Sequence, residues 1–324
     1  MRAALLALCL LAGGQATLQA RADPDQLLFL DYARHLARSS SDGRSGEVLT
    51  PFTLGDKEGL QMLAAGRQYA LFRHKTRDRD TVFIHDTATH RLAFSQEVPA
   101  NTDVVGPLFG EPETFMLRTF IGATDRNTAF IVNLRTGTLL GTLTTQGSKD
   151  TIQALPDGRL YRINDDSGRI AVAAADGAWR DIGALQIPQG LKIGAWRISH
   201  RGDRIAISYG RVDDIGVYRS DIWVAGIDGS GQYRLTNQQD MKQPRWSPDD
   251  RQVAFQFDTR SSVVGAGFHG AGLTGHCSNW RVPVASANVS GISHGRAHPV
   301  ASQMFANVDG RPMSDLCRII AWER

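Results

Sequence analysis

A tight turn followed at once by a short apolar strand recurs along this chain, and its clearest copy runs from Pro244 to Phe255 (PRWSPDDRQVAF). Five copies can be aligned, and the spacing between their aligned strand residues is 46, 45, 45 and 48; those residues are Tyr69, Phe115, Leu160, Ile205 and Val253. A regular period of this length is typical of repeat architectures. It leaves room for four short strands and their turns, which is one repeat unit of an all-β fold.

A second apolar strand follows each aligned residue; the copies lie at 81–86, 129–134, 168–173, 221–226 and 278–283. No apolar run keeps a helical period of 3.6, and strand-sized runs alternate with Gly, Asp and Asn turns, which indicates antiparallel sheets. A single four-stranded unit cannot bury both of its faces, whereas a ring of units buries them and protects the strand edges. We therefore predict an all-β protein with a β-propeller fold of six blades, with seven as the alternative.

The two ends of the repeat region suggest how the ring closes. Residues 23–30 repeat the turn-then-strand pattern near the N-terminus, and residues 46–50 resemble the outer strand at 233–236. A further apolar strand lies at 317–322. We expect the N- and C-terminal strands to share one blade, so that residues 21–324 form a single propeller domain. We expect the polar segment from Ser39 to Gly46 to be a mobile loop.

The segment 1–20 has the pattern of a secretory signal peptide. Arg2 precedes an apolar run at 3–12, and small and polar residues follow up to Ala20. This run is too short to span a bilayer, which takes about 20 apolar residues. We therefore expect an exported protein, periplasmic or secreted, with no membrane span in the mature chain.

Cysteine usage fits that compartment. Removal of the segment 1–20 would remove Cys9 and leave Cys277 and Cys317. An even pair of cysteines in an oxidising compartment predicts a disulfide, and this one would close the loop between positions 277 and 317. Two free buried thiols are the alternative.

The charge pattern excludes one class of partner. The formal net charge is +3, and basic and acidic residues interleave along the chain. No block of Lys and Arg marks a surface for nucleic acid, so we expect no nucleic-acid partner.

The stretch from Trp246 to Phe255, together with Pro244 and the preceding segment 234–236 (RLT), resembles the propeller repeat of the TolB family. The resemblance is strong over 195–258 and faint over 60–190 and 278–322. TolB is the periplasmic component of the Tol–Pal envelope system. The same repeat also occurs in the propellers of prolyl-oligopeptidase-type peptidases and of pectate-fragment lyases. TolB carries an α/β domain before its propeller, and only a short stretch separates the predicted signal from the first repeats here, so we expect that domain to be absent.

Residues 291–295 (GISHG) match the Gly-x-Ser-x-Gly pattern of a hydrolase nucleophile elbow. That motif functions only on a strand–turn–helix of a parallel sheet, and the stretch 296–324 that follows it is too short for the rest of such a domain. We interpret Ser293 as part of a glycine-bearing loop.

Four of the nine histidines lie close together in the sequence, near Cys277 in a Gly-rich region; they are His269, His276, His294 and His298. Imidazole is a common transition-metal ligand, so a metal site is one hypothesis. No spacing matches a known zinc signature, and polar loop histidines around a disulfide are the alternative.

Three weaker features complete the candidates. The acidic pairs Asp165–Asp166 and Asp213–Asp214 follow strands and could bind a cation, although solvated turn acids are the usual case. Asn288 begins a formal glycosylation sequon, Asn-Val-Ser. The Gly-rich segment 261–275 is longer than a turn requires, and we expect any functional site to lie where it meets the end of the blades.

Taken together, these patterns predict an exported, non-catalytic propeller that acts as a scaffold binding a protein or a cell-envelope component. We expect no cofactor on this reading. The alternative is a metal-dependent lyase or hydrolase acting on polysaccharide fragments, which depends on the four histidines. A propeller that has kept its fold and lost its ancestral partner site is a third hypothesis.

Overall fold

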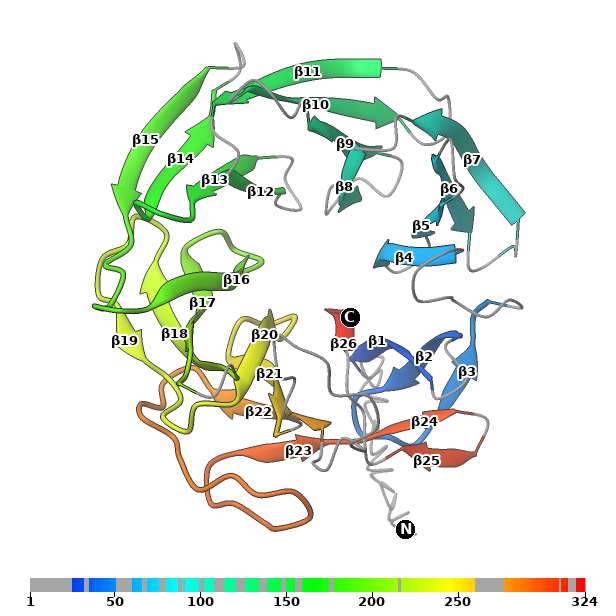
Figure 1. Ribbon diagram of the computed structural model, residues 1–324. Coiled ribbons are helices and arrows are strands. Elements are labelled where there is room, and N and C mark those ends of the chain that lie inside the picture. Colours follow the sequence, from blue (N-terminus) through cyan, green and yellow to red (C-terminus); the bar gives the residue numbers. More distant parts are fainter. Residues whose placement is uncertain are drawn as a thin grey trace, which may run out of the picture.

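The computed structural model describes residues 25–31, 35–50, 60–65, 69–75, 80–86, 89, 91–98, 102–107, 114–120, 126–133, 139–146, 150–154, 159–174, 178–214, 217–259, 277–308, 310–313 and 319–323. Within these residues every regular element is a β-strand, and all ladders between named strands are antiparallel. The strands form six four-stranded sheets and one two-stranded hairpin, and Figure 1 shows the sheets arranged around a central axis. The turn-then-strand repeat therefore does produce antiparallel sheets.

Three of the sheets are formed by strands of the first half of the chain, and the first of them also includes the last strand. The first contains β26 (Ile319–Glu323), β1 (Gln26–Leu30), β2 (Leu36–Ser40) and β3 (Gly46–Val48). The second contains β4 (Leu60–Ala65), β5 (Tyr69–Lys75), β6 (Asp80–Asp86) and β7 (Arg91–Val98). The third contains β8 (Thr102–Pro107), β9 (Thr114–Phe120), β10 (Arg126–Asn133) and β11 (Leu139–Gln146).

The other three sheets come from the second half. The fourth contains β12 (Asp150–Ala154), β13 (Leu160–Asn164), β14 (Arg169–Ala173) and β15 (Trp179–Ala184). The fifth contains β16 (Lys192–Ile198), β17 (Arg204–Val212), β18 (Tyr218–Gly226) and β19 (Tyr233–Arg234). The sixth contains β20 (Met241–Trp246), β21 (Gln252–Asp258), β22 (Cys277–Pro283) and β23 (Ser302–Met304). In Figure 1 the first strand of each sheet is the innermost one.

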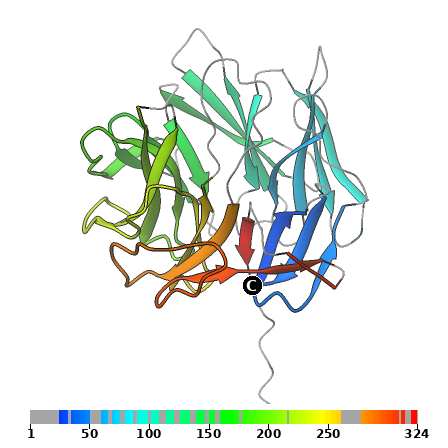
Figure 2. The same ribbon diagram turned by 60° about the horizontal axis from the view of Figure 1, so that its bottom comes forward.

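The first sheet joins the two ends of the chain. Strand β26 pairs with β1 in an antiparallel ladder in which Gln26 faces Glu323 and Leu28 faces Ala321. Between β23 and β26 the chain forms the hairpin β24 (Ala306–Val308) and β25 (Arg311–Met313), which packs against β2 and β3. Figure 2 shows this orange-red segment passing from the sixth sheet to the first.

The core lies between neighbouring sheets. One buried cluster joins the fifth and sixth sheets; it includes Ile222, Val224, Met241, Trp246, Phe255 and Trp280. A second cluster joins the fourth and fifth sheets and includes Tyr161, Ile163, Trp196, Ile198 and Ile207. Alternating side chains of one strand therefore face opposite neighbours, as the period of two along a strand requires.

The turn of the repeat has the same backbone hydrogen bonds in two sheets. In the sixth sheet Asp250 N donates to Ser247 O at 2.9 Å, and in the fifth Gly202 N donates to Ser199 O at 2.9 Å. Asp250 and Gly202 both have a positive φ, of 59° and 75°. The two positions are therefore structural equivalents.

The loop predicted from Ser39 to Gly46 is shorter in the structure, because Ser39 and Ser40 end β2 and Gly46 begins β3, and its mobility stays a prediction. The segment is the hairpin turn between β2 and β3, and Gly43 has a φ of 70°. The Ser40 hydroxyl donates to Asp42 at 2.6 Å, and Gly43 N donates to Ser40 O at 2.9 Å. Serine and aspartate are common in such segments because their side chains bond the local backbone and define a turn.

Residues 284–301, which we call the strap, join β22 to β23 and run along the outer edge of the fifth sheet. Asn288 N donates to Arg234 O at 3.0 Å, and Asn237 N donates to Val289 O at 2.8 Å. Val289 and Ile292 are buried in the cluster between the fifth and sixth sheets. The strap therefore covers an edge that would otherwise present unpaired backbone groups.

Candidate interaction face

One end of the fifth and sixth sheets carries the β17–β18 turn, the segment leading into β20, and the end of β21. We call this end the connection face. Charged side chains gather here; they are Asp213, Arg219, Asp240, Lys242 and Asp258, and their exposed fractions run from 13% to 29%. Charges this far removed from water need partners, so their contacts define the candidate site.

Arg219 is the centre of the group. Its Nε donates to Asp213 at 3.0 Å, and its Nη1 donates to Asp240 at 2.8 Å. Asp213 also accepts a hydrogen bond from the backbone N of Val217 at 2.8 Å. The bonds to Asp240 and Asp213 raise the pKa of Arg219. One guanidinium thus ties the β17–β18 turn to the segment leading into β20.

Asp240 differs from the other acids of the face. Burial raises its pKa, nearby Asp258 adds to that effect, and the hydrogen bond from Arg219 opposes it. Lys242 Nζ lies 3.9 Å from Asp258, and Asp258 N donates to Asp240 O at 3.1 Å. The group contains three carboxylates and two cations, so it is suited to polar contacts with a charged partner.

The segment leading into β20 is held in place by β18. Asp221 is buried and accepts hydrogen bonds from Thr236 Oγ1, Gln238 N and Arg234 Nη2 at 2.9, 2.8 and 2.6 Å. Ser220 Oγ donates to Met241 O at 2.6 Å. The Arg-Leu-Thr sequence at 234–236 therefore serves to fix the position of Asp240.

Asp240 gives a pH-dependent prediction. The pKa of Asp240 in the folded state lies above the usual 3.8. As the pH rises, the Asp240 carboxyl therefore loses its proton in the unfolded state before it does so in the folded state. The contribution of the group to stability is therefore full below pH 3.8 and declines as the pH rises through its folded pKa. We expect the free energy of unfolding of the wild type to fall, relative to that of Asp240→Asn, as the pH rises from 4 to 7. Urea denaturation across this range measures it, and a constant difference would contradict the assignment.

The four predicted metal-binding histidines are not brought together in the described part of the chain. His269 and His276 lie outside it. His294 and His298 both lie in the strap. His298 Nε2 is 2.9 Å from Ser290 O, and its Nδ1 accepts from Val300 N and Ala301 N at 3.2 and 2.9 Å. Both ring nitrogens of His298 thus serve the strap itself.

No three His, Cys, Asp or Glu side chains of the described residues are grouped as a metal site requires. The four-histidine site stays a prediction, because half of it falls outside those residues.

Ser293 lies in the strap, on no strand–turn–helix. Gly291 and Gly295 flank it with φ values of 81° and 70°. Ile292 N donates to the Gln238 side chain at 2.7 Å, and Ile292 O accepts from it at 2.5 Å. The interpretation of this motif as a glycine-bearing loop is confirmed.

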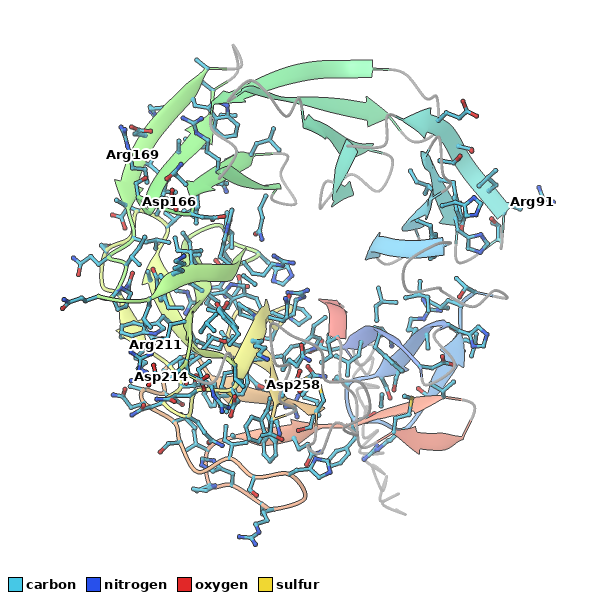
Figure 3. All side chains as sticks on the ribbon, viewed as in Figure 1. Arg91, Asp166, Arg169, Arg211, Asp214 and Asp258 are labelled. Atoms are coloured by element: carbon cyan, nitrogen blue, oxygen red, sulfur yellow. The ribbon has the colours of Figure 1, made fainter. Side chains whose placement is uncertain are left out.

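The remaining candidates are scattered. Cys277 is buried at the start of β22, whereas Cys317 lies outside the described residues, so their pairing stays a prediction. Asp165 and Asp166 form the β13–β14 turn, and Asn288 is exposed on the strap. Figure 3 labels Asp166, Asp214 and Asp258, which lie at the turn or strand end between the second and third strands of three successive sheets. The segment predicted at 261–275 also lies outside the described residues, in the sequence between β21 and β22.

Four residues of the connection face are absent from the predicted site residues: Arg219, Asp240, Lys242 and Asp258. Arg219 and Asp240 meet across a change of sheet, and nothing in a single sequence marks that contact. The buried Asp221 had a stronger signal, because its strand is a repeat copy and is followed by the Arg-Leu-Thr sequence.

Comparison with known proteins bears on the fold. No protein-family model matches this sequence, and no curated protein matches it. Among solved structures, TolB from Acinetobacter baumannii superposes with a TM-score of 0.53 at 14% identity, covering 82% of this chain and 64% of that one. The chain has a TolB-like propeller fold. A putative TolB from Agrobacterium tumefaciens matches with a TM-score of 0.48 at 15% identity, covering 82% of this chain and 87% of that one.

An oligogalacturonate lyase in complex with manganese matches with a TM-score of 0.41 at 14% identity, covering 69% of this chain and 60% of that one. At these identities the similarity concerns the fold alone, because propellers host unrelated activities. The chain spans 64% of the length of the A. baumannii TolB. The described residues of the TolB-like chain contain no helix with the length and hydrophobicity needed to cross a bilayer.

Proposed function

We propose that the protein is an exported, six-bladed propeller that acts as a non-catalytic scaffold and binds a protein or cell-envelope partner at its connection face. Each of the six four-stranded sheets would be one blade, and the β1–β26 ladder would close the ring. The signal-like segment 1–20 lies outside the described residues, so export rests on the sequence pattern.

The observation that carries this proposal is the charge group of the connection face. Arg219, Asp240 and Asp258 are partly buried, and Asp258 is the last residue of β21. A binding site formed by loops on a rigid scaffold is the common arrangement in proteins of this kind. Arg211 and Asp214 extend the face with exposed side chains, and both are labelled in Figure 3.

Acids outnumber cations on the connection face, so a partner that presents basic side chains would fit it. Complementary charge of this kind speeds association and selects partners more than it adds affinity. The described residues provide no specific observation in favour of the lyase or hydrolase alternative.

A photo-crosslinking amino acid tests the proposal when it is placed at position 214 on the connection face or at position 251. Arg251 is exposed in the β20–β21 turn, at the opposite end of the sheets. We expect crosslinks to an envelope partner from position 214 and none from position 251. Arg211→Glu adds negative charge to a face that attracts a basic partner, so it should increase the yield of crosslinked partner at least tenfold. The matched Arg251→Glu should leave that yield unchanged.

Equal crosslinking from the two positions would contradict the proposal. So would capture that is insensitive to both charge reversals.

A further inference from the structure

The innermost strands β16 and β20 can be aligned position by position at the end that carries the connection face (Figure 1). Ile193 pairs with Tyr209 in the fifth sheet, and Met241 pairs with Phe257 in the sixth. Both residues of the second pair lie 48 positions after their counterparts, which is the spacing between the aligned residues of these two repeats. The register of both strand pairs shifts close to these positions. The two sheets therefore have the same backbone plan here.

The sixth sheet fills this part of the plan with an ion pair. Lys242 Nζ lies 3.9 Å from Asp258, and the two residues lie on neighbouring strands. At the equivalent positions of the fifth sheet, 48 residues earlier, both are replaced by glycine, Gly194 and Gly210. The fifth sheet thus has no side chain at either place where the sixth sheet has a charged one.

The space over the two glycines is occupied by Tyr218 from β18. A Cβ on Gly194 would lie 2.7 Å from the tyrosine hydroxyl oxygen, and a Cβ on Gly210 would lie 2.6 Å from the same oxygen. Ser208 Oγ is equally close to the Gly194 position, but it already accepts from Ala195 N at 2.7 Å and donates to Ala195 O at 3.1 Å. Tyr218 therefore reaches across β17 and presents its hydroxyl to the innermost strand.

The Tyr218 hydroxyl is available to a ligand. It has no hydrogen-bond partner among the described residues, and its oxygen stays accessible to water. Burial of the side chain raises the pKa of Tyr218, so the hydroxyl keeps its proton at neutral pH and can donate it. A hydrogen-bond donor is thus held beside the innermost strand with nothing in the described structure to accept from it.

Lys192 lies next to this hydroxyl. It occupies the position that Asp240 has in the sixth sheet, and it is directly opposite Gly210 in the β16–β17 ladder. Side chains that are opposite each other in an antiparallel ladder point to the same side of the sheet, so the lysine stem lies on the side where Tyr218 covers Gly210. Lys192 is exposed and has no carboxylate partner among the described residues.

We propose that Lys192 and Tyr218 form a binding site for an oxyanion, a carboxylate or a phosphate group, at the innermost strand of the fifth sheet. Both groups donate hydrogen bonds, and the ammonium supplies the charge that such a ligand requires. Gly194 leaves the strand without a side chain beside the hydroxyl, so a ligand can approach the backbone closely there. The site adjoins the acidic connection face, but it binds the opposite charge and does not depend on the partner proposed for that face.

Isothermal titration of the purified protein with sodium acetate and with sodium phosphate, against sodium chloride at equal ionic strength, tests the site. We expect at least one oxyanion to bind more tightly than chloride, and the tighter of the two identifies the class of ligand. Lys192→Gln should weaken that binding about tenfold because it removes the charge, and Tyr218→Phe about fivefold because it removes one donor. Arg251→Gln removes an equal charge at the opposite end of the sheets and should leave the binding unchanged.

Tyr218→Phe should fold like the wild type, because the ring remains and the lost hydroxyl bonds no described residue; equal thermal midpoints check this. Isotopic labelling of tyrosine at Cζ locates the anion, since the resonance that is absent from Tyr218→Phe should shift during the titration of the wild type. The proposal is overturned if neither oxyanion binds more tightly than chloride, or if that resonance does not shift. It is also overturned if either variant, well folded, keeps the wild-type affinity.

Discussion

Alanine at Gly229 should reduce the free energy of unfolding by about 3 kcal/mol, through backbone strain together with a steric clash. Gly229 lies in the β18–β19 turn with a φ of 85°. A Cβ there would lie 2.0 Å from the carbonyl oxygen of Ala184 in the neighbouring sheet. That atom belongs to the backbone, so it cannot rotate away. Gly183 has the reciprocal problem, since its Cβ would lie 1.9 Å from Asp228 O.

Gly231 provides the matched control. It follows in the same turn with a φ of 60°, and a Cβ there would meet nothing within 4 Å. Gly231→Ala should therefore cost only the left-handed backbone conformation, about 1 kcal/mol. Urea denaturation of the two variants measures the difference, which reports the close approach of the fourth and fifth sheets at the rim. Equal losses would show that the two sheets do not meet there.

Loss of the Asp250 carboxylate should have a similarly large effect, about 3 kcal/mol, because this buried group is the acceptor for three partly buried donors. Asp250 is 1% exposed and accepts from His200 N and Arg201 N at 2.8 and 2.9 Å. His200 Nδ1 lies 2.9 Å from the same carboxylate. These bonds join the turn of the sixth sheet to the turn of the fifth, so Asp250→Ala should loosen the contact between the two sheets.

Asp249→Ala is the control for this change. Asp249 lies in the same turn, but its carboxylate accepts only from Ser247 Oγ and Arg251 N, and 38% of the side chain is exposed. We expect a loss under about 1 kcal/mol. Chemical denaturation compares the two, and hydrogen exchange at His200 and Arg201 should rise in Asp250→Ala alone. A loss in Asp249→Ala as large as that in Asp250→Ala would refute the bridging role of Asp250.

The strands could be predicted because their signals are local. Tyr69, Phe115, Leu160, Ile205 and Val253 all lie in strands, and each strand is the second of its sheet. A turn residue with a fixed backbone requirement followed by an apolar run is enough to identify these strands. The same local pattern also predicted the strands at both ends of the chain.

The strap and the connection face could not be predicted in this way. Val289 and Ile292 are isolated apolar residues in a polar segment, and their hydrogen-bond partners, Leu235 and Gln238, come before the sixth sheet begins. Arg219 and Asp240 meet across a change of sheet. Contacts of this kind depend on how the sheets stack, and one sequence carries no direct record of it.

The register of β1 and β26 has a mechanical consequence. Gln26 lies opposite Glu323, so the N-terminal end of β1 and the C-terminal end of β26 are at the same end of the sheet. Tension applied between these two residues would separate the strands like a zipper, breaking the pairs one after another rather than shearing the whole ladder at once. Opening in this geometry requires little force, and the first sheet would yield before the five sheets that are each formed by consecutive strands.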